Sequence, residues 1–493
     1  MSKNSYSHIL KYTGLFGGIQ FLNILIALIR NKFVALILGP QGMGLISIYN
    51  STTNLMSNST NLGIPMSGIK NISESFEQGD TEKINQSVKL IRSWSMLTAL
   101  LGMFACILLS PVLNDVTFSW GEHTLHFVCL SPIIALTAIT SGEIAILKGT
   151  RHLGKLAKIS VYNIIGALIT SVPIYYFFRD AGIIPSLIII AGIQMLLTIH
   201  MSYRLYPPAV SLSRNHLNTG CDMVKLGIAF VFAGILGSGA DFAIRSFLNN
   251  ASSLDTVGLF NAGYMMTMTY AGMVFSAMET DFFPRLSAVN GEITKSNTIV
   301  NNQIEVSLLL IAPMLVTFII GLPVILPLLY SKSFMPVSDM MKITIIAMYF
   351  RVIKLPIAYT TLARGDSGAY LLLEGLYDII VVILTVIGFT HMGLVGAGLA
   401  MTITTIIDLC IVIGFTHYKY KYVISTSVIK YLSLQLPVGL MAFAASFIVN
   451  ALVYWLIGGA LVLISTLISI RILQSKVSLW NKLVSRFTIR KQQ

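Results

Sequence analysis

The sequence predicts an all-α polytopic membrane protein with about fourteen transmembrane helices, arranged as two pseudo-symmetric six-helix lobes around a central cavity and followed by a C-terminal helix pair. Three observations support this fold class. Hydrophobic residues make up 55% of the 493 residues and charged residues only 11%, whereas soluble domains carry about 25% charged residues. Long apolar runs recur along the chain, and its two halves resemble each other. This composition excludes a soluble enzyme, a disordered protein and a disulfide scaffold.

Apolar runs long enough to cross a bilayer define the expected spans, because a hydrocarbon core of about 30 Å needs roughly 20 residues of helix. No small-residue cleavage site follows the first run, so we expect a retained helix and not a signal peptide. The spans lie near residues 10–38, 43–67, 91–113, 124–147, 157–178, 182–203, 224–250, 256–283, 301–330, 339–363, 370–389, 393–416, 429–450 and 452–472.

The basic residues indicate how these spans are oriented. With the N-terminus inside, 25 of the 33 lysines and arginines fall in cytoplasmic segments, and the outer loops hold Arg179, Lys332 and Lys342. An excess of basic residues marks the cytoplasmic side of membrane proteins. We therefore expect both termini in the cytoplasm. The net charge of +13 is then mostly a topology signal, and it needs no nucleic-acid partner.

The two halves of the chain align at a spacing near 214 residues. GMGLISIYN (42–50) aligns with TVGLFNAGY (256–264), which pairs Gly44 with Gly258. Six helices per lobe is an even number, so both lobes have the same topology, as in transporters with parallel repeats. The predicted domains are an N-lobe (1–206, helices 1–6), a C-lobe (207–418, helices 7–12) and a C-terminal helix pair with a basic cytoplasmic tail (419–493).

Arg351 and Lys354 lie deep inside the tenth predicted span. A cation at the centre of a membrane helix costs at least about 2.5–3.5 kcal/mol and usually faces a cavity or a partner. The two residues are three apart and so share a helix face. We expect them to bind an anionic substrate; the alternative is a structural pair with Glu143 or Asp378.

Three further basic residues fall inside predicted spans. Arg30 and Lys32 lie toward the outer end of the first span, so they are either substrate-binding or snorkelling to the interface. Being two residues apart, they point to different faces. Arg245 falls within one residue of the repeat position of Arg30, but Asp241, four residues before it, offers a simple ion-pair partner.

The second span is unusually polar. Asn50, Asn54, Asn58 and Asn61 recur at helical spacing and form one stripe. Amide side chains both donate and accept hydrogen bonds, which suits a hydroxyl-rich substrate in a wet cavity. The alternative is hydrogen bonding between helices.

The sequence offers no candidate for covalent chemistry. It contains no GxxxxGK[ST], HExxH or GxSxG motif and no CxxC pair, so we expect no enzyme activity, no catalytic residues, no metal and no cofactor. Glu143 and Asp378 are weak candidates for coupling to an ion or a proton.

Three segments carry a resemblance to a known family. LGPQGMGL (38–45) ends the first span, NLGIPMSGIKNISE (61–74) ends the second, and KGTRHLGK (148–155) forms a cytoplasmic loop. With the six-plus-six repeat, these resemble Wzx-type polysaccharide flippases of the multidrug/oligosaccharidyl-lipid/polysaccharide exporter superfamily, which also holds lipid II flippases and MATE drug exporters. The final helix pair (429–472) is absent from many Wzx-type chains but present in lipid II flippases.

This resemblance implies transport of an oligosaccharide linked to undecaprenyl (pyro)phosphate, such as an O-antigen repeat unit, across the bacterial inner membrane by alternating access. Arg30 matches the first-helix arginine of lipid II flippases, and the diphosphate would meet Arg30, Arg245, Arg351 and Lys354. Membrane lipids and a polysaccharide polymerase or chain-length machinery are the other expected partners. The alternatives are a MATE-like cation-coupled multidrug exporter, which needs acidic residues deep in its cavity, and a membrane scaffold without transport.

Overall fold

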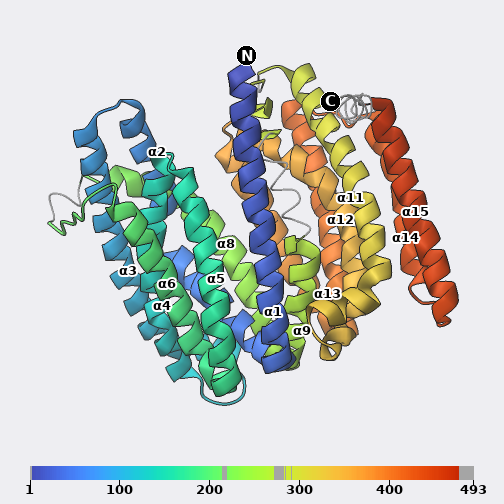
Figure 1. Ribbon diagram of the computed structural model, residues 1–493, viewed down its shortest axis with the longest axis horizontal. Coiled ribbons are helices and arrows are strands. Elements are labelled where there is room, and N and C mark those ends of the chain that lie inside the picture. The colour runs from blue at the N-terminus through green and yellow to red at the C-terminus, as the bar shows by residue number, and fades with distance from the viewer. Residues whose placement is uncertain (1–2, 214–218, 271–281, 284, 290, 477–493) are drawn as a thin grey trace, which may run out of the picture. The chain divides into compact units, whose positions relative to one another are not determined.

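The computed structural model describes residues 3–213, 219–270, 282–283, 285–289 and 291–476 (Figure 1). Within these ranges every regular element is a helix, which confirms the all-helical fold class. In the part of the chain that the structure describes, eight helical segments are long and apolar enough to cross a membrane. Part of the span predicted at 256–283 and the predicted basic tail (477–493) lie outside the described residues.

The helices in the described ranges are α1 (Lys3–Thr60), α2 (Ile64–Glu77), α3 (Thr81–Thr117), α4 (Thr124–Gly149), α5 (Leu153–Phe178), η1 (Arg179–Gly182), α6 (Ile183–Tyr203), α8 (Cys221–Ala251), α9 (Leu254–Tyr264), the π-helix η2 (Met265–Tyr270), α11 (Ile293–Leu329), η3 (Lys332–Val337), α12 (Ser338–Ala363), α13 (Ser367–Tyr420), α14 (Thr426–Ala445) and α15 (Ala451–Lys476).

Two of the longest helices, α1 and α13, are each broken at a glycine. Gly39 has φ 65° and ψ −168°, and Gly393 has φ 57° and ψ −139°. Glycine enters this region at little steric cost because it has no Cβ. The breaks fall where the sequence predicts one span to end and the next to begin. Both α1 and α13 therefore hold two of the predicted spans.

The second predicted span is too long at its end. It was expected to run to residue 67, but α1 ends at Thr60 and α2 begins separately at Ile64. Leu62 and Gly63 between them have φ values of 50° and 72°, which no α-helix contains. Pro65 then occupies the first turn of α2, where the ring of proline is tolerated.

The chain forms two compact units. Unit 1 consists of Met1–Asn261 and Leu329–Phe334, and unit 2 of Ala262–Leu328 and Met335–Gln493. In unit 1, Ile72, Ile91 and Ile146 belong to a buried cluster. In unit 2, Ile353 and Leu409 belong to another. The two lobes predicted from the sequence repeat divide the chain at residue 206 and are a different division from these units. They stay a prediction.

Within unit 1, α1 crosses α9 at the two glycines that the repeat aligns. A Cβ added to Gly44 would collide with the carbonyl oxygen of Leu254, and one added to Gly258 would collide with that of Pro40. Pro40 and Leu254 are themselves 214 residues apart, as are the glycines. The contact is therefore reciprocal, as contacts about a two-fold axis are. Such a contact is expected if the aligned segments 42–50 and 256–264 pack on each other symmetrically.

The C-terminal helices α14 and α15 belong to unit 2 and are joined by a polar contact. Gln435 on α14 donates to Ser469 Oγ at 2.9 Å and accepts from Ser465 Oγ at 2.7 Å. On α15, Tyr454 donates its hydroxyl to the carbonyl oxygen of Ile320 on α11 at 2.6 Å. The predicted C-terminal pair is thus attached to the body of unit 2.

Candidate functional site

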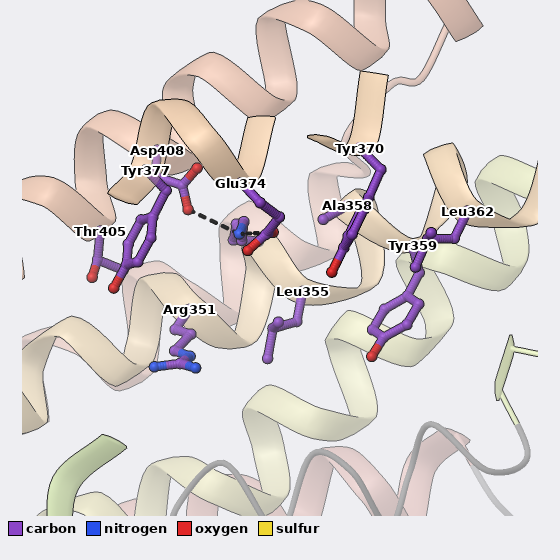
Figure 2. A pocket seen from close by; sticks show the side chains of 11 residues that line it. Arg351, Leu355, Ala358, Tyr359, Leu362, Tyr370, Glu374, Tyr377, Thr405 and Asp408 are labelled. Carbon is purple, nitrogen blue, oxygen red and sulfur yellow. Dashed lines mark hydrogen bonds and ion pairs between the residues drawn. The ribbon is translucent and has the colours of Figure 1, made fainter. Parts of the chain in front are cut away.

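A cavity of about 140 Å³ lies between α12 and the two halves of α13 in unit 2, and we call it the α12–α13 cavity (Figure 2). The break at Gly393 folds α13 back, so residues from both of its halves reach the same side of α12. The lining residues are Arg351, Lys354, Leu355, Ala358, Tyr359 and Leu362 from α12, and Tyr370, Glu374, Tyr377, Thr405 and Asp408 from α13.

Lys354 is held by two carboxylates. Its Nζ lies 3.0 Å from Oε1 of Glu374 and 3.1 Å from Oδ2 of Asp408. The side chains of Lys354 and Asp408 are buried, and that of Glu374 is 34% exposed. A buried ammonium is tolerated only when it is paired and hydrogen-bonded. The acidic partners that the sequence offered were Glu143 and Asp378, so for Lys354 that structural alternative names the wrong residues.

Arg351 lies one helical turn before Lys354 and has no such partner among the described residues. Its Nη1 donates to Sδ of Met268 at 3.0 Å. A thioether is a weak acceptor, and a guanidinium offers five N–H donors. In Figure 2 its head group lies apart from the two ion pairs of Lys354. Of the two cations in the cavity, Lys354 is therefore paired with two carboxylates, whereas no carboxylate in the described chain contacts Arg351.

In unit 1, Arg30 and Lys32 point to different partners, as their spacing predicts. Arg30 donates from Nε to the hydroxyl of Ser171 on α5 at 3.0 Å. Lys32 donates from Nζ to the carbonyl oxygen of Tyr330 at 2.6 Å. Both side chains are partly exposed.

Arg245 on α8 is buried and paired with Asp241, the partner that its sequence neighbourhood offered. The distance from its Nη1 to Oδ1 of Asp241 is 2.9 Å. Its Nε also donates to Ser47 Oγ on α1 at 2.7 Å, and its Nη2 to Oδ1 of Asn261 at 3.4 Å. Arg245 therefore joins α8 to α1 and α9 inside unit 1.

The asparagine stripe of α1 divides into two parts. Asn50 and Asn54 are exposed. Asn58 donates to the carbonyl oxygen of Gly234 on α8 at 3.4 Å, and Asn61 accepts from the backbone N–H of Gly63 at 2.8 Å. Asn58 thus makes the contact between helices that the alternative expects, Asn61 bonds within the turn after α1, and Asn50 and Asn54 remain exposed.

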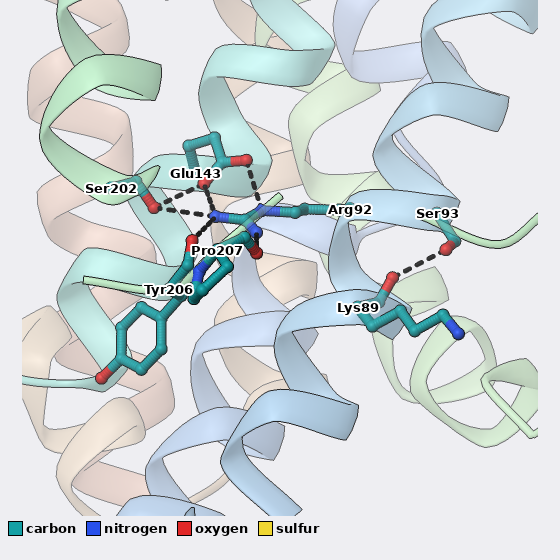
Figure 3. Close-up of polar contacts among 7 residues, drawn as sticks. All are labelled: Lys89, Arg92, Ser93, Glu143, Ser202, Tyr206 and Pro207. Atoms are coloured by element: carbon teal, nitrogen blue, oxygen red, sulfur yellow. Dashed lines mark hydrogen bonds and ion pairs between the residues drawn. The ribbon is translucent and has the colours of Figure 1, made fainter. Parts of the chain in front are cut away.

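Glu143 lies in a buried network in unit 1 that the sequence did not reveal (Figure 3). Arg92 on α3 holds it with two hydrogen bonds, from Nε at 2.7 Å and from Nη2 at 3.2 Å, and Ser202 donates to it at 2.6 Å. Arg92 also donates to the carbonyl oxygens of Tyr206 and Pro207. This fully bonded carboxylate favours a structural role for Glu143 over ion coupling.

The other coupling candidate, Asp378, is partly exposed on α13, next to Tyr377. The structure does not bring it into the ion pairs of Lys354. Glu374 and Asp408, which hold that lysine, are the acids that the sequence should have singled out. The available signal was Lys354 itself, because a deeply placed lysine requires a nearby acid.

Known proteins share both sequence features and fold with this chain. A family model described as polysaccharide biosynthesis protein matches residues 9–290. The solved structure of the lipid II flippase MurJ in an inward closed conformation superimposes with a TM-score of 0.74 at 15% identity, covering 93% of this chain and 99% of that one.

Two further solved structures share the same fold. An inward-facing multidrug resistance MATE family transporter of the MOP superfamily gives a TM-score of 0.66 at 16% identity, covering 83% of this chain and 98% of that one. A MOP superfamily transporter from Pyrococcus furiosus gives 0.57 at 12% identity, covering 83% and 95%. No curated protein sequence matches significantly. At these identities the likeness concerns the fold.

Proposed function

Because the chain belongs to the polysaccharide biosynthesis protein family, we propose that it is a flippase for an oligosaccharide linked to undecaprenyl (pyro)phosphate, such as an O-antigen or other surface-polysaccharide repeat unit. The family confirms the resemblance expected from the sequence, and the fold is that of MOP-superfamily transporters. The lipid-linked sugar would move from the cytoplasmic to the periplasmic leaflet of a bacterial inner membrane. Both termini would be cytoplasmic, as the basic residues predict.

The observation that carries this proposal is the state of Arg30. It lies in a membrane-spanning helix, and within the described chain its side chain bonds to the neutral hydroxyl of Ser171 alone. A guanidinium matches the oxygens of a phosphate with two parallel hydrogen bonds. Arg30 can therefore supply its remaining donors to the diphosphate, whereas Lys32 points to a different partner.

The other predicted substrate-binding residues differ in how available they are. Arg245 and Lys354 each have carboxylate partners. They would therefore contribute to the electrostatic potential around the substrate and would not be the first residues to contact it. Asn50 and Asn54 are exposed on α1 and could hydrogen-bond sugar hydroxyls, with Asn58 and Asn61 extending the stripe. The polyprenyl chain would remain in the lipid while the head group crosses by alternating access.

A MATE-like drug exporter is less well supported. Coupling to cations and binding of cationic drugs both need acidic side chains that are available to a cation. Four acidic residues are instead paired with basic side chains: Glu143, Asp241, Glu374 and Asp408. The α12–α13 cavity of about 140 Å³ is also smaller than the 300–1,000 Å³ typical of drug-sized ligands.

A reconstituted flipping assay tests the proposal. Purified protein in liposomes should move a fluorescent undecaprenyl-diphosphate oligosaccharide between leaflets, and Arg30→Gln should reduce the rate at least about tenfold, because a hydrogen bond to a charged group is worth about 1.5–3 kcal/mol. Arg204→Gln, an exposed arginine at the end of α6, is the matched control. Equal rates in protein-free and protein-containing liposomes would contradict the proposal.

A further inference from the structure

We infer that the α12–α13 cavity is a subsite for one acidic sugar residue, whose carboxylate binds Arg351 while its hydroxyls bind the surrounding tyrosines and carboxylates. This inference rests on the proposed flippase function and specifies its substrate: an oligosaccharide that carries a uronic-acid-type sugar. The size of the cavity, its charge and its hydrogen-bonding groups all bear on which ligand it can hold.

The size of the cavity suits one sugar ring. Its volume is about 140 Å³, about half of the lower end of the 300–1,000 Å³ typical of sites for drug-sized ligands. An oligosaccharide or a drug-sized molecule needs more room. The cavity therefore has room for one sugar of a longer oligosaccharide.

The described lining of the cavity holds two cations and two carboxylates, and Arg351 is the cation that neither carboxylate contacts. Glu374 and Asp408 both contact Lys354, so its charge is already matched by two carboxylates. Arg351 contacts the sulfur of Met268 at 3.0 Å, a partner that an incoming anion readily replaces. A carboxylate can accept two parallel hydrogen bonds from this guanidinium. A diphosphate would bring more negative charge beside the two acids, so a monoanion is favoured.

The remaining polar groups match a hydroxyl-rich ring. Tyr359, Tyr370, Tyr377 and Thr405 line the cavity and carry hydroxyls that can both donate and accept. In Figure 2 the hydroxyl ends of the three tyrosines and the Arg351 head group extend toward the same side. The tyrosine rings also present apolar faces for the C–H groups of a sugar. Together with the partly exposed Glu374, they form a mixed lining of the kind that binds small ligands specifically.

The test compares two synthetic undecaprenyl-diphosphate disaccharides that differ only in the terminal sugar, glucuronic acid or glucose, in the flipping assay. The wild-type protein should move the glucuronate lipid about tenfold faster, as expected from one charge-assisted contact. Arg351→Gln should abolish this preference, and an unfolding temperature equal to that of the wild type shows that the variant is folded. Arg364→Gln, in the loop after α12, should keep the preference.

Binding measurements separate the carboxylate from the diphosphate as the bound anion. By isothermal titration calorimetry on the full-length protein in nanodiscs, glucuronate should bind the wild type but not Arg351→Gln, whereas the binding of inorganic pyrophosphate should be the same in both proteins. The inference is overturned if Arg351→Gln removes pyrophosphate binding instead, or if the wild type moves both lipids equally. Movement of neither lipid would contradict the flippase function itself, so the two failures are distinguishable.

Discussion

The buried pair of Arg92 and Glu143 gives a sharp test of whether Glu143 holds the structure together or couples transport to an ion. The two side chains are 3% and 2% exposed, and Arg92 donates two hydrogen bonds to Glu143. We consider three variants: Arg92→Met, Glu143→Leu and the double variant. Each single change removes one charge and leaves its partner buried without compensation.

The expected magnitudes differ between the single and double variants. Removing one member of a buried ion pair costs about 3–5 kcal/mol, because the other charge is left without a partner. For Arg92→Met the carbonyl oxygens of Tyr206 and Pro207 also lose their donor. The double variant should be clearly more stable than either single variant, since replacing both charges with apolar side chains is often nearly neutral.

The measurements are thermal unfolding in detergent and the flipping rate in liposomes. A structural pair predicts that both single variants unfold at lower temperature and that the double variant recovers both stability and transport. The opposite pattern would refute the reasoning: Glu143→Leu as stable as the wild type but inactive, with the double variant equally inactive. That result would return Glu143 to the ion-coupling role that its position in the sequence suggests.

Three further predictions concern stability. Gly44→Ala should destabilise unit 1 by about 1–3 kcal/mol because its Cβ would overlap the backbone of α9, whereas Gly192→Ala, whose Cβ meets nothing within 4 Å, should not; thermal unfolding compares them. Lys354→Met should lower the unfolding temperature, because the buried Asp408 and the partly exposed Glu374 lose their counter-charge, and unchanged stability would contradict the ion-pair geometry. Asp366, in the loop before α13, has its pKa lowered from 3.8 to about 2, first by a hydrogen bond from Lys419. Because the pKa of Asp366 is lower in the folded state, the stabilisation it provides is present above pH 3.8 and is lost as the pH falls toward 2. Hydrogen exchange at the start of α13 should therefore depend on pH in this range, and Asp366→Asn should remove that dependence. A pH profile that is the same in the variant and the wild type would contradict this prediction.

The sequence predicts where the helices of this protein begin and end better than it predicts which side chains contact one another. Apolar runs interrupted by glycine located the breaks at Gly39 and Gly393, because helix continuity and its interruption are local properties. The end of the second span was missed at Gly63, where the polar residues that precede it do not distinguish a continuing helix from a turn. The repeat spacing paired Gly44 with Gly258, and the structure places them in reciprocal contact.

The ion pairs could not be predicted, because each joins segments far apart in the chain. Arg92 and Glu143 are 51 residues apart, and Lys354 lies between acids from the two halves of a helix that folds back at Gly393. Which acid meets which base depends on helix rotation and tilt, and the apolar pattern constrains these only weakly. Sequence spacing did predict the pair of Arg245 with Asp241, because both lie on one helix face.

The partners of the intramembrane cations suggest a division of labour that fits a transporter. A substrate site must be filled and emptied in every cycle, so the contacts that its cations make when empty must be easily exchanged. Arg30 bonds to a hydroxyl and Arg351 to a thioether, so no charged partner is left unpaired when a substrate takes the place of either contact. Arg245 and Lys354 are instead held by carboxylates, whose hydrogen bonds to charged groups are worth about 1.5–3 kcal/mol. Cations with neutral partners are therefore suited to bind and release an anionic head group, and cations with acidic partners to hold the helices that carry them.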